Sequence, residues 1–210
     1  MHDIDEPRWS EALVVLSNCL RHPDPSLRRA IVSTDGANEM TAALDRVGVD
    51  STPPSVADRD LTEDYESLFG AFRTPFAPPA ASPYEEWYEG REGLMGGPPA
   101  ARMLRRYEAL DAELPDAYPP DHVALQLEYA SILLDAGERE ALREFVGDDL
   151  AWIDAFAVLV DEAVADAPFH RWCVEVLLTT VSGLRDALGV DGPTGETIER
   201  MAERGRQHAE

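Results

Sequence analysis

Apolar side chains recur every three or four residues along most of this chain, which is the spacing of one face of an α-helix. No segment combines sustained apolar-polar alternation with β-branched enrichment, so a sheet has no candidate strands. The sequence therefore predicts an all-α fold, a compact globule of about nine to ten helices. The expected helices cover residues 9–20, 25–33, 35–47, 65–72, 103–114, 121–135, 138–147, 150–164, 168–188 and 196–210.

A stretch rich in proline and glycine interrupts this pattern near 73–99. Proline disfavours regular helix and glycine has wide conformational freedom, so we expect a flexible connection there. We expect a single all-helical domain over 1–210, with a division into two lobes near 90–120 as the alternative.

Two proline-containing segments are typical of helix starts. In the first, Ser82 is the expected N-cap, Pro83 the first helical residue and Glu85 the third, which together form a capping box for a short helix over 83–89. In the second, Asp121 follows two prolines and is the expected N-cap of the next helix.

The helix expected at 121–135 is apolar on every side, which indicates a central position in the fold. Glu128 lies in its middle, where a buried carboxylate needs a cation or several donors. Arg102, Arg105 or Arg106 is the expected partner.

Asp121 and His122 allow two interpretations. The simpler one makes them a helix cap and its neighbour. The alternative places them in contact with a peptide or another ligand at the start of the helix.

The charge of the chain is strongly one-sided. It has 41 acidic residues against 18 basic ones, all of them arginine, and a formal net charge of −23. Self-repulsion of this size is relieved near 1 M salt, where the Debye length is about 3 Å, so the composition predicts a salt-rich, halophilic cytoplasm. The acidic residues are spread over the whole chain and the arginines form no basic cluster, which argues against nucleic acid and anionic membranes as partners.

The chain lacks the sequence motifs of several classes of enzyme. A chain without lysine has no P-loop, the five histidines do not form the helical zinc-hydrolase pattern, and no nucleophile elbow is present. We therefore expect no catalytic residues, no metal and no cofactor. Acid–base chemistry by a pair of carboxylates stays open as the enzymatic alternative.

The remaining features indicate a protein that stays in the cytoplasm. The first residues lack an apolar signal core, and no apolar run approaches the roughly 18 residues of a membrane span. Cys19 and Cys173 are far apart in the sequence and are expected to be small core residues of a protein from a reducing compartment.

The order and spacing of four motifs resemble the TorD/DmsD family of redox-enzyme maturation chaperones. The most specific is the Pro-Pro-Asp-His helix start followed by Leu-Glu-Tyr. The motifs are Glu63-Asp64-Tyr65-Glu66-Ser67-Leu68-Phe69, Ser82-Pro83-Tyr84-Glu85, Tyr107, and Pro119-Pro120-Asp121-His122 running into Leu127-Glu128-Tyr129.

The resemblance implies an all-helical cytoplasmic chaperone rather than an enzyme. Its partners would be the twin-arginine signal peptide and the apo form of the catalytic subunit of a molybdopterin oxidoreductase. The client would be of the dimethyl sulfoxide or trimethylamine oxide reductase type, or a nitrate reductase. A stable assembly scaffold or accessory subunit that does not bind the leader is the alternative, and the chain is expected to be a monomer or a homodimer.

A twin-arginine leader offers two guanidinium groups and an apolar stretch, so its receptor needs carboxylates and aromatic side chains. The resemblance places Asp121 and His122 at peptide recognition or at the hinge. An aromatic stripe that includes Tyr65 is also typical of core packing. The candidate peptide-binding residues are Tyr65, Phe72, Tyr84, Glu85, Glu86, Trp87, Tyr88, Asp121 and His122.

Overall fold

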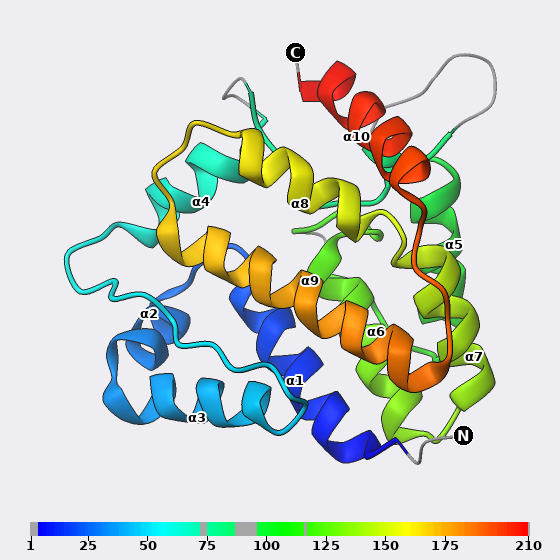
Figure 1. Ribbon diagram of the computed structural model, residues 1–210, viewed down its shortest axis with the longest axis horizontal. Coiled ribbons are helices and arrows are strands. Elements are labelled where there is room, and N and C mark those ends of the chain that lie inside the picture. Colours follow the sequence, from blue (N-terminus) through cyan, green and yellow to red (C-terminus); the bar gives the residue numbers. More distant parts are fainter. Residues whose placement is uncertain (1–3, 72–74, 87–95, 116, 210) are drawn as a thin grey trace.

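The computed structural model describes residues 4–71, 75–86, 96–115 and 117–209. These ranges contain ten α-helices and no strand, which confirms the all-helical prediction (Figure 1). An isolated antiparallel bridge joins Ala80 to His122. The helices are α1 (Glu6–Cys19), α2 (Pro25–Val32), α3 (Thr34–Asp45), α4 (Leu61–Phe69), α5 (Pro98–Ala109), α6 (Val123–Asp135), α7 (Arg139–Glu144), α8 (Ile153–Glu162), α9 (Pro168–Leu188) and α10 (Gly195–Ala209).

Helix α6 is the central helix, as its uniformly apolar sequence predicts. Nine of its 13 residues are buried. Helix α1 packs along it (Figure 1). Polar groups from neighbouring elements fix its first turns: the Tyr107 hydroxyl donates to the Leu125 carbonyl at 2.8 Å, and the Trp152 indole N–H donates to the Gln126 side-chain oxygen at 2.8 Å. These bonds fix the position of the start of α6, where the candidate site lies.

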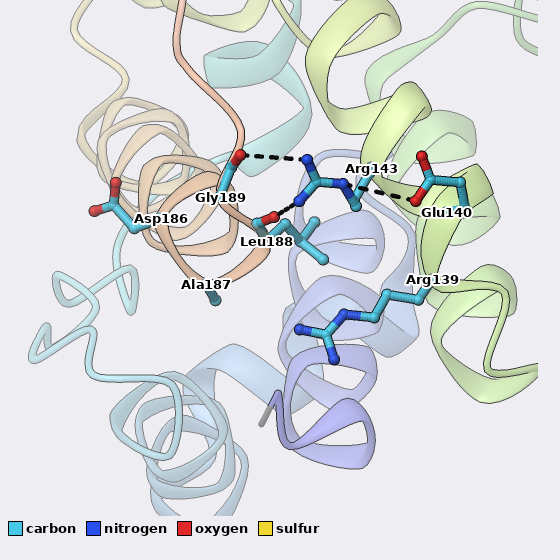
Figure 2. A pocket seen from close by; sticks show the side chains of 7 residues that line it. All are labelled: Arg139, Glu140, Arg143, Asp186, Ala187, Leu188 and Gly189. Atoms are coloured by element: carbon cyan, nitrogen blue, oxygen red, sulfur yellow. Dashed lines mark hydrogen bonds and ion pairs between the residues drawn. The ribbon is translucent and has the colours of Figure 1, made fainter. Parts of the chain in front are cut away.

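Helix α9 begins and ends as local sequence chemistry predicts. Pro168 occupies its first turn, and Gly189 follows its end with φ of 64°, in the left-handed region that favours glycine. Figure 2 shows how Arg143 of α7 closes this end, because its guanidinium donates to the carbonyls of Leu188 and Gly189. The carbonyls at the end of α9 are thus bound by a cation, the charge that this end of a helix favours.

A short 3-10 turn, η1 (Ser82–Tyr84), lies beneath α10. Gly205 allows this close contact, because a Cβ atom there would lie 2.8 Å from the Tyr84 ring and from Leu159. Tyr84 is fully buried, and its hydroxyl donates to the Pro78 carbonyl at 3.0 Å. The turn is therefore enclosed by packed side chains.

The prediction of a capping box at this turn is wrong. The N-cap of the turn is Ala81, which makes no side-chain cap bond, and Glu85 has an extended backbone with φ of −94° and ψ of 152°. The Glu85 carboxylate instead accepts two hydrogen bonds from Arg102 of α5, at 2.7 and 2.8 Å. The helix expected over 83–89 is thus a 3-10 turn that ends at Tyr84, and 87–89 lie outside the described residues.

The expected partner of Glu128 is also wrong. Its carboxylate accepts from Arg21, just beyond the end of α1, at 2.7 Å, and not from Arg102, Arg105 or Arg106. The side chain is 42% exposed, so α6 is not closed around this residue and the carboxylate remains partly solvated.

Both cysteines are buried and free, as expected for small core residues. They are distant in sequence but close enough in space for Cys19 to affect the pKa of Cys173, and the Cys19 thiol donates to the Met40 sulfur at 3.8 Å. Burial raises the pKa of the Cys173 thiol, which keeps it protonated.

The excess of acidic side chains makes stability depend on salt. Because 41 acidic residues face 18 arginines, a net charge of −23 remains and repels itself. We expect a change from 1 M to 0.1 M KCl to lower the melting temperature by roughly 4–8 °C, which corresponds to about 2 kcal/mol. Circular dichroism melts test this, with sucrose as an uncharged control; a melting temperature independent of KCl would contradict the prediction.

Candidate functional site

An apolar pocket of about 500 Å³ opens where the chain enters α6. Its walls come from the α1–α2 turn, α4, the extended segment before η1 and the loop before α6. The lining residues are His22, Pro23, Asp24, Tyr65, Pro79, Ala80, Ala117, Tyr118, Pro119 and His122. Tyr65, Ala80 and His122 are buried and form the floor, whereas His22 and Asp24 are exposed at the rim.

Local hydrogen bonds position the rim. The Asp24 carboxylate caps α2 by accepting from the backbone N–H of Ser26 at 2.7 Å and of Leu27 at 2.8 Å. The Ser26 hydroxyl and these backbone N–H groups lower the pKa of Asp24, so the rim carries a negative charge. Across the opening, the Tyr118 hydroxyl accepts from the backbone N–H of His22 at 3.0 Å.

His122, not Asp121, caps α6, which corrects the expected N-cap. Its Nδ1 atom accepts the backbone N–H of Ala124 at 3.2 Å, and its Nε2 atom lies 3.3 Å from the Tyr65 hydroxyl. The Tyr118 ring packs against the imidazole with 4.6 Å between centroids. Burial lowers the pKa of His122 to about 3, so the imidazole is neutral.

Asp121 precedes the pocket residue His122 in the chain and is fully buried. Its Oδ2 atom accepts from the Ser82 backbone N–H at 2.7 Å and from the Ser82 hydroxyl. Burial raises the pKa of this carboxyl, against the effect of the Ser82 hydrogen bonds. Asp121 therefore joins the two predicted helix entrances, residues 82 and 121, to each other.

Glu85 and Glu86 lie at a second hollow, separate from the pocket. Arg102 bridges Glu85 to Asp149, and Arg106 also donates to Asp149 at 2.6 Å. Glu86 is exposed and accepts from Arg204 of α10 at 3.1 Å. The side-chain partners of both glutamates in the described part of the chain are thus arginines.

The structure brings together only some of the nine candidate residues. Tyr65 and His122 meet at the pocket, Glu85 and Glu86 lie at the second hollow, and Tyr84 and Asp121 are buried between packed elements. The other three, Phe72, Trp87 and Tyr88, lie outside the described residues. Contact of these nine residues with a peptide stays a prediction.

Sequence reasoning missed His22, Pro23 and Tyr118 as pocket residues. The signals were a His-Pro-Asp-Pro turn between two expected helices and a tyrosine directly before Pro119. Neither pattern reveals that the two segments meet, because they are 96 residues apart in the chain.

Fold and site together define an all-helical protein with an apolar pocket at the start of its central helix. A model of the nitrate reductase delta subunit family matches residues 33–165, and the chain belongs to this family of redox enzyme maturation chaperones. The predicted chaperone family is thereby confirmed, while the TorD/DmsD branch within it stays a prediction.

A crystal structure of a protein from Archaeoglobus fulgidus, described as a redox enzyme maturation protein, is similar in structure, with a TM-score of 0.49 and 19% sequence identity. The alignment covers 88% of this chain and 96% of that one. No curated protein sequence matches the chain. In the described part of the chain, no helix is both long and apolar enough to span a membrane.

Proposed function

We propose that this protein is a cytoplasmic chaperone that binds the twin-arginine signal peptide of a molybdopterin oxidoreductase catalytic subunit. It holds the apo subunit until the cofactor is inserted and export can begin. The client is a nitrate reductase or an enzyme of the dimethyl sulfoxide or trimethylamine oxide reductase type. The observation that carries this proposal is the apolar pocket with an acidic rim at the start of α6.

The pocket and its surroundings fit both parts of such a leader. Three prolines and two aromatic side chains line the cavity and suit an apolar side chain. Asp24 at the rim and the exposed Glu66, 3.9 Å from His22, supply carboxylates for guanidinium groups. In concentrated salt, direct contacts of this kind persist while long-range attraction is screened.

A titration tests the proposal directly. The full chain is mixed in 1 M KCl with a fluorescent twin-arginine leader, and with the same leader carrying two lysines or two glutamines. We expect the glutamine leader to bind at least about tenfold more weakly, because each charge-assisted hydrogen bond contributes about 1.5–3 kcal/mol. Equal affinity for all three leaders, or no binding, would overturn leader recognition.

A stable accessory subunit is the second candidate, because the matching family is described as a delta subunit. Such a subunit would remain bound to the mature, cofactor-loaded enzyme, whereas a chaperone would associate with the precursor that lacks the cofactor. Purification through a tag on this chain, followed by molybdenum analysis of the bound partner, separates the two functions.

A further inference from the structure

The hydroxyl of Tyr65 carries a proton with no acceptor in the described part of the protein. We propose that this O–H group donates a hydrogen bond to a backbone carbonyl of the bound leader, beside an apolar side chain seated in the pocket. The inference rests on the proposed function, and it assigns to the pocket a donor that selects a neutral peptide segment.

The arrangement of protons at His122 leads to this conclusion. Its Nδ1 atom accepts the Ala124 N–H at 3.2 Å, so Nδ1 carries no proton. The neutral ring then has its proton on Nε2, which lies 3.3 Å from the Tyr65 oxygen. Nε2–H is therefore the donor and the Tyr65 oxygen the acceptor, which leaves the phenolic proton without an acceptor among the described residues.

The Tyr65 side chain is positioned to present that proton to the pocket. Tyr65 is 8% exposed and lines the cavity. Ring contacts hold it in place, with centroid distances of 4.9 Å to Phe69 and 5.2 Å to His22. A buried polar group without a partner costs free energy, and a ligand that accepts from it removes that cost.

The charges around the pocket decide which acceptor fits. The Asp24 carboxylate at the rim and the neighbouring Glu66 would repel an anion. Of the arginines near the rim, Arg21 already pairs with Glu128 at 2.7 Å, and the charge of Arg29 acts on the Asp24 carboxylate. The acceptor is therefore a neutral carbonyl and not a carboxylate or a phosphate.

The walls of the pocket determine which ligand group lies beside that carbonyl. Pro23, Pro79 and Pro119 have no N–H, and the carbonyls of Pro79 and Pro119 already accept from Val123 and His122. These walls offer apolar contact rather than a ladder of backbone hydrogen bonds. An apolar residue of a peptide supplies both parts of the ligand, a side chain for the cavity and a carbonyl for Tyr65.

The test removes only the hydroxyl. Tyr65→Phe keeps the ring, and Tyr129→Phe is a matched control, because it removes a hydroxyl from an α6 tyrosine that does not line the pocket. We expect Tyr65→Phe to raise the dissociation constant of the twin-arginine leader about five- to tenfold and Tyr129→Phe to leave it unchanged. Melting temperatures check that both variants are folded.

Leader analogues identify the carbonyl and keep the test independent of any folding defect. A single ester bond weakens one carbonyl as an acceptor, and esters are placed one at a time along the apolar stretch. One position is expected to weaken binding to the wild-type chain about fivefold, without further effect on Tyr65→Phe, as coupled partners do in a double-mutant cycle. Equal affinities of Tyr65→Phe and Tyr129→Phe, with no sensitive ester, would overturn the inference.

A small probe separates this inference from the proposed function. N-acetyl-leucine methylamide carries the apolar side chain and the carbonyl but no arginine. If it shifts the NMR signals of the His122 ring in the wild-type chain and not in Tyr65→Phe, while the leader fails to bind, the pocket assignment holds and leader recognition is wrong. If neither the probe nor the leader binds, both are wrong.

Discussion

Acidification from pH 7 to pH 4 is expected to lower the free energy of unfolding by about 6 kcal/mol through two buried histidines. Burial lowers the pKa of His122 to about 3 and that of His170 to about 4. In the unfolded chain both take up a proton near pH 6.5, whereas the folded chain resists it until pH 4 or below. The unfolded state therefore binds more protons across this range, and stability falls as the pH falls.

Of the two histidines, His170 gives the clearer test because its surroundings are more apolar. Its side chain is fully buried, and neither ring nitrogen has a hydrogen-bond partner among the described residues. Aromatic rings surround it, with centroid distances of 5.4 Å to Tyr65, 5.8 Å to Phe69 and 5.4 Å to Phe169. An imidazolium in this apolar cluster would be strongly destabilised.

Urea unfolding at pH 7, 6, 5 and 4 in 1 M KCl measures the effect. Carboxyl groups with raised pKa values, among them Asp121 and Glu85, oppose it, because their protonation favours the folded chain at low pH. The comparison with His170→Leu isolates the histidine, and we expect this variant to lose about 3 kcal/mol less than the wild type. Phe169→Leu, in the same cluster but without a titrating group, should keep the wild-type pH dependence; a wild-type slope in His170→Leu would contradict the prediction.

Local sequence chemistry predicted the helices well but not the partners of their polar residues. The spacing of apolar residues places all ten helices, and Pro168 and Gly189 mark the two ends of α9. The sequence predicts Asp121 as the cap of α6 because aspartate is a preferred N-cap residue, but the adjacent His122 also carries an acceptor. The choice depends on Ser82, which is 39 residues away and binds the Asp121 carboxylate.

A contact between distant segments also explains the irregular end of α7. The sequence predicts a regular helix over 138–147, whereas the structure has a π-helical turn at Phe145–Asp149. This turn places Asp149, with a side chain only 4% exposed, against both Arg102 and Arg106. The spacing of apolar residues carries no information about such a contact with α5.

The sequence predicts only part of the candidate site. Tyr65 and His122 were proposed from separate motifs, and the structure places them in one pocket. Glu85 was proposed for the same site, but its carboxylate is bound by Arg102. The motifs identified residues at the start of α6 and around η1. Contacts between distant segments decide which of these residues reach the surface.

Tyr84→Ala is expected to lower the free energy of unfolding by about 4 kcal/mol, because it empties a fully buried site. The ring packs 5.1 Å from the Trp152 ring and 6.4 Å from that of Phe156, and α10 closes over it at Gly205. Tyr84→Phe loses only the hydrogen bond to the Pro78 carbonyl, and we expect a cost of about 1 kcal/mol. Urea unfolding in 1 M KCl measures both variants.

The Tyr84→Phe variant also decides how Tyr84 contributes to leader binding. Because its hydroxyl and ring face the interior, Tyr84 supports the chain segment that carries Pro79 and Ala80 into the pocket wall. Tyr84→Phe should therefore bind the leader as the wild type does, and Thr180→Val, which removes a buried hydroxyl bond to a carbonyl within α9, is the control. A tenfold loss of affinity in Tyr84→Phe, with a stability loss of no more than about 1 kcal/mol and an unchanged control, would show that Tyr84 contacts the peptide and that the packing around η1 opens to admit it.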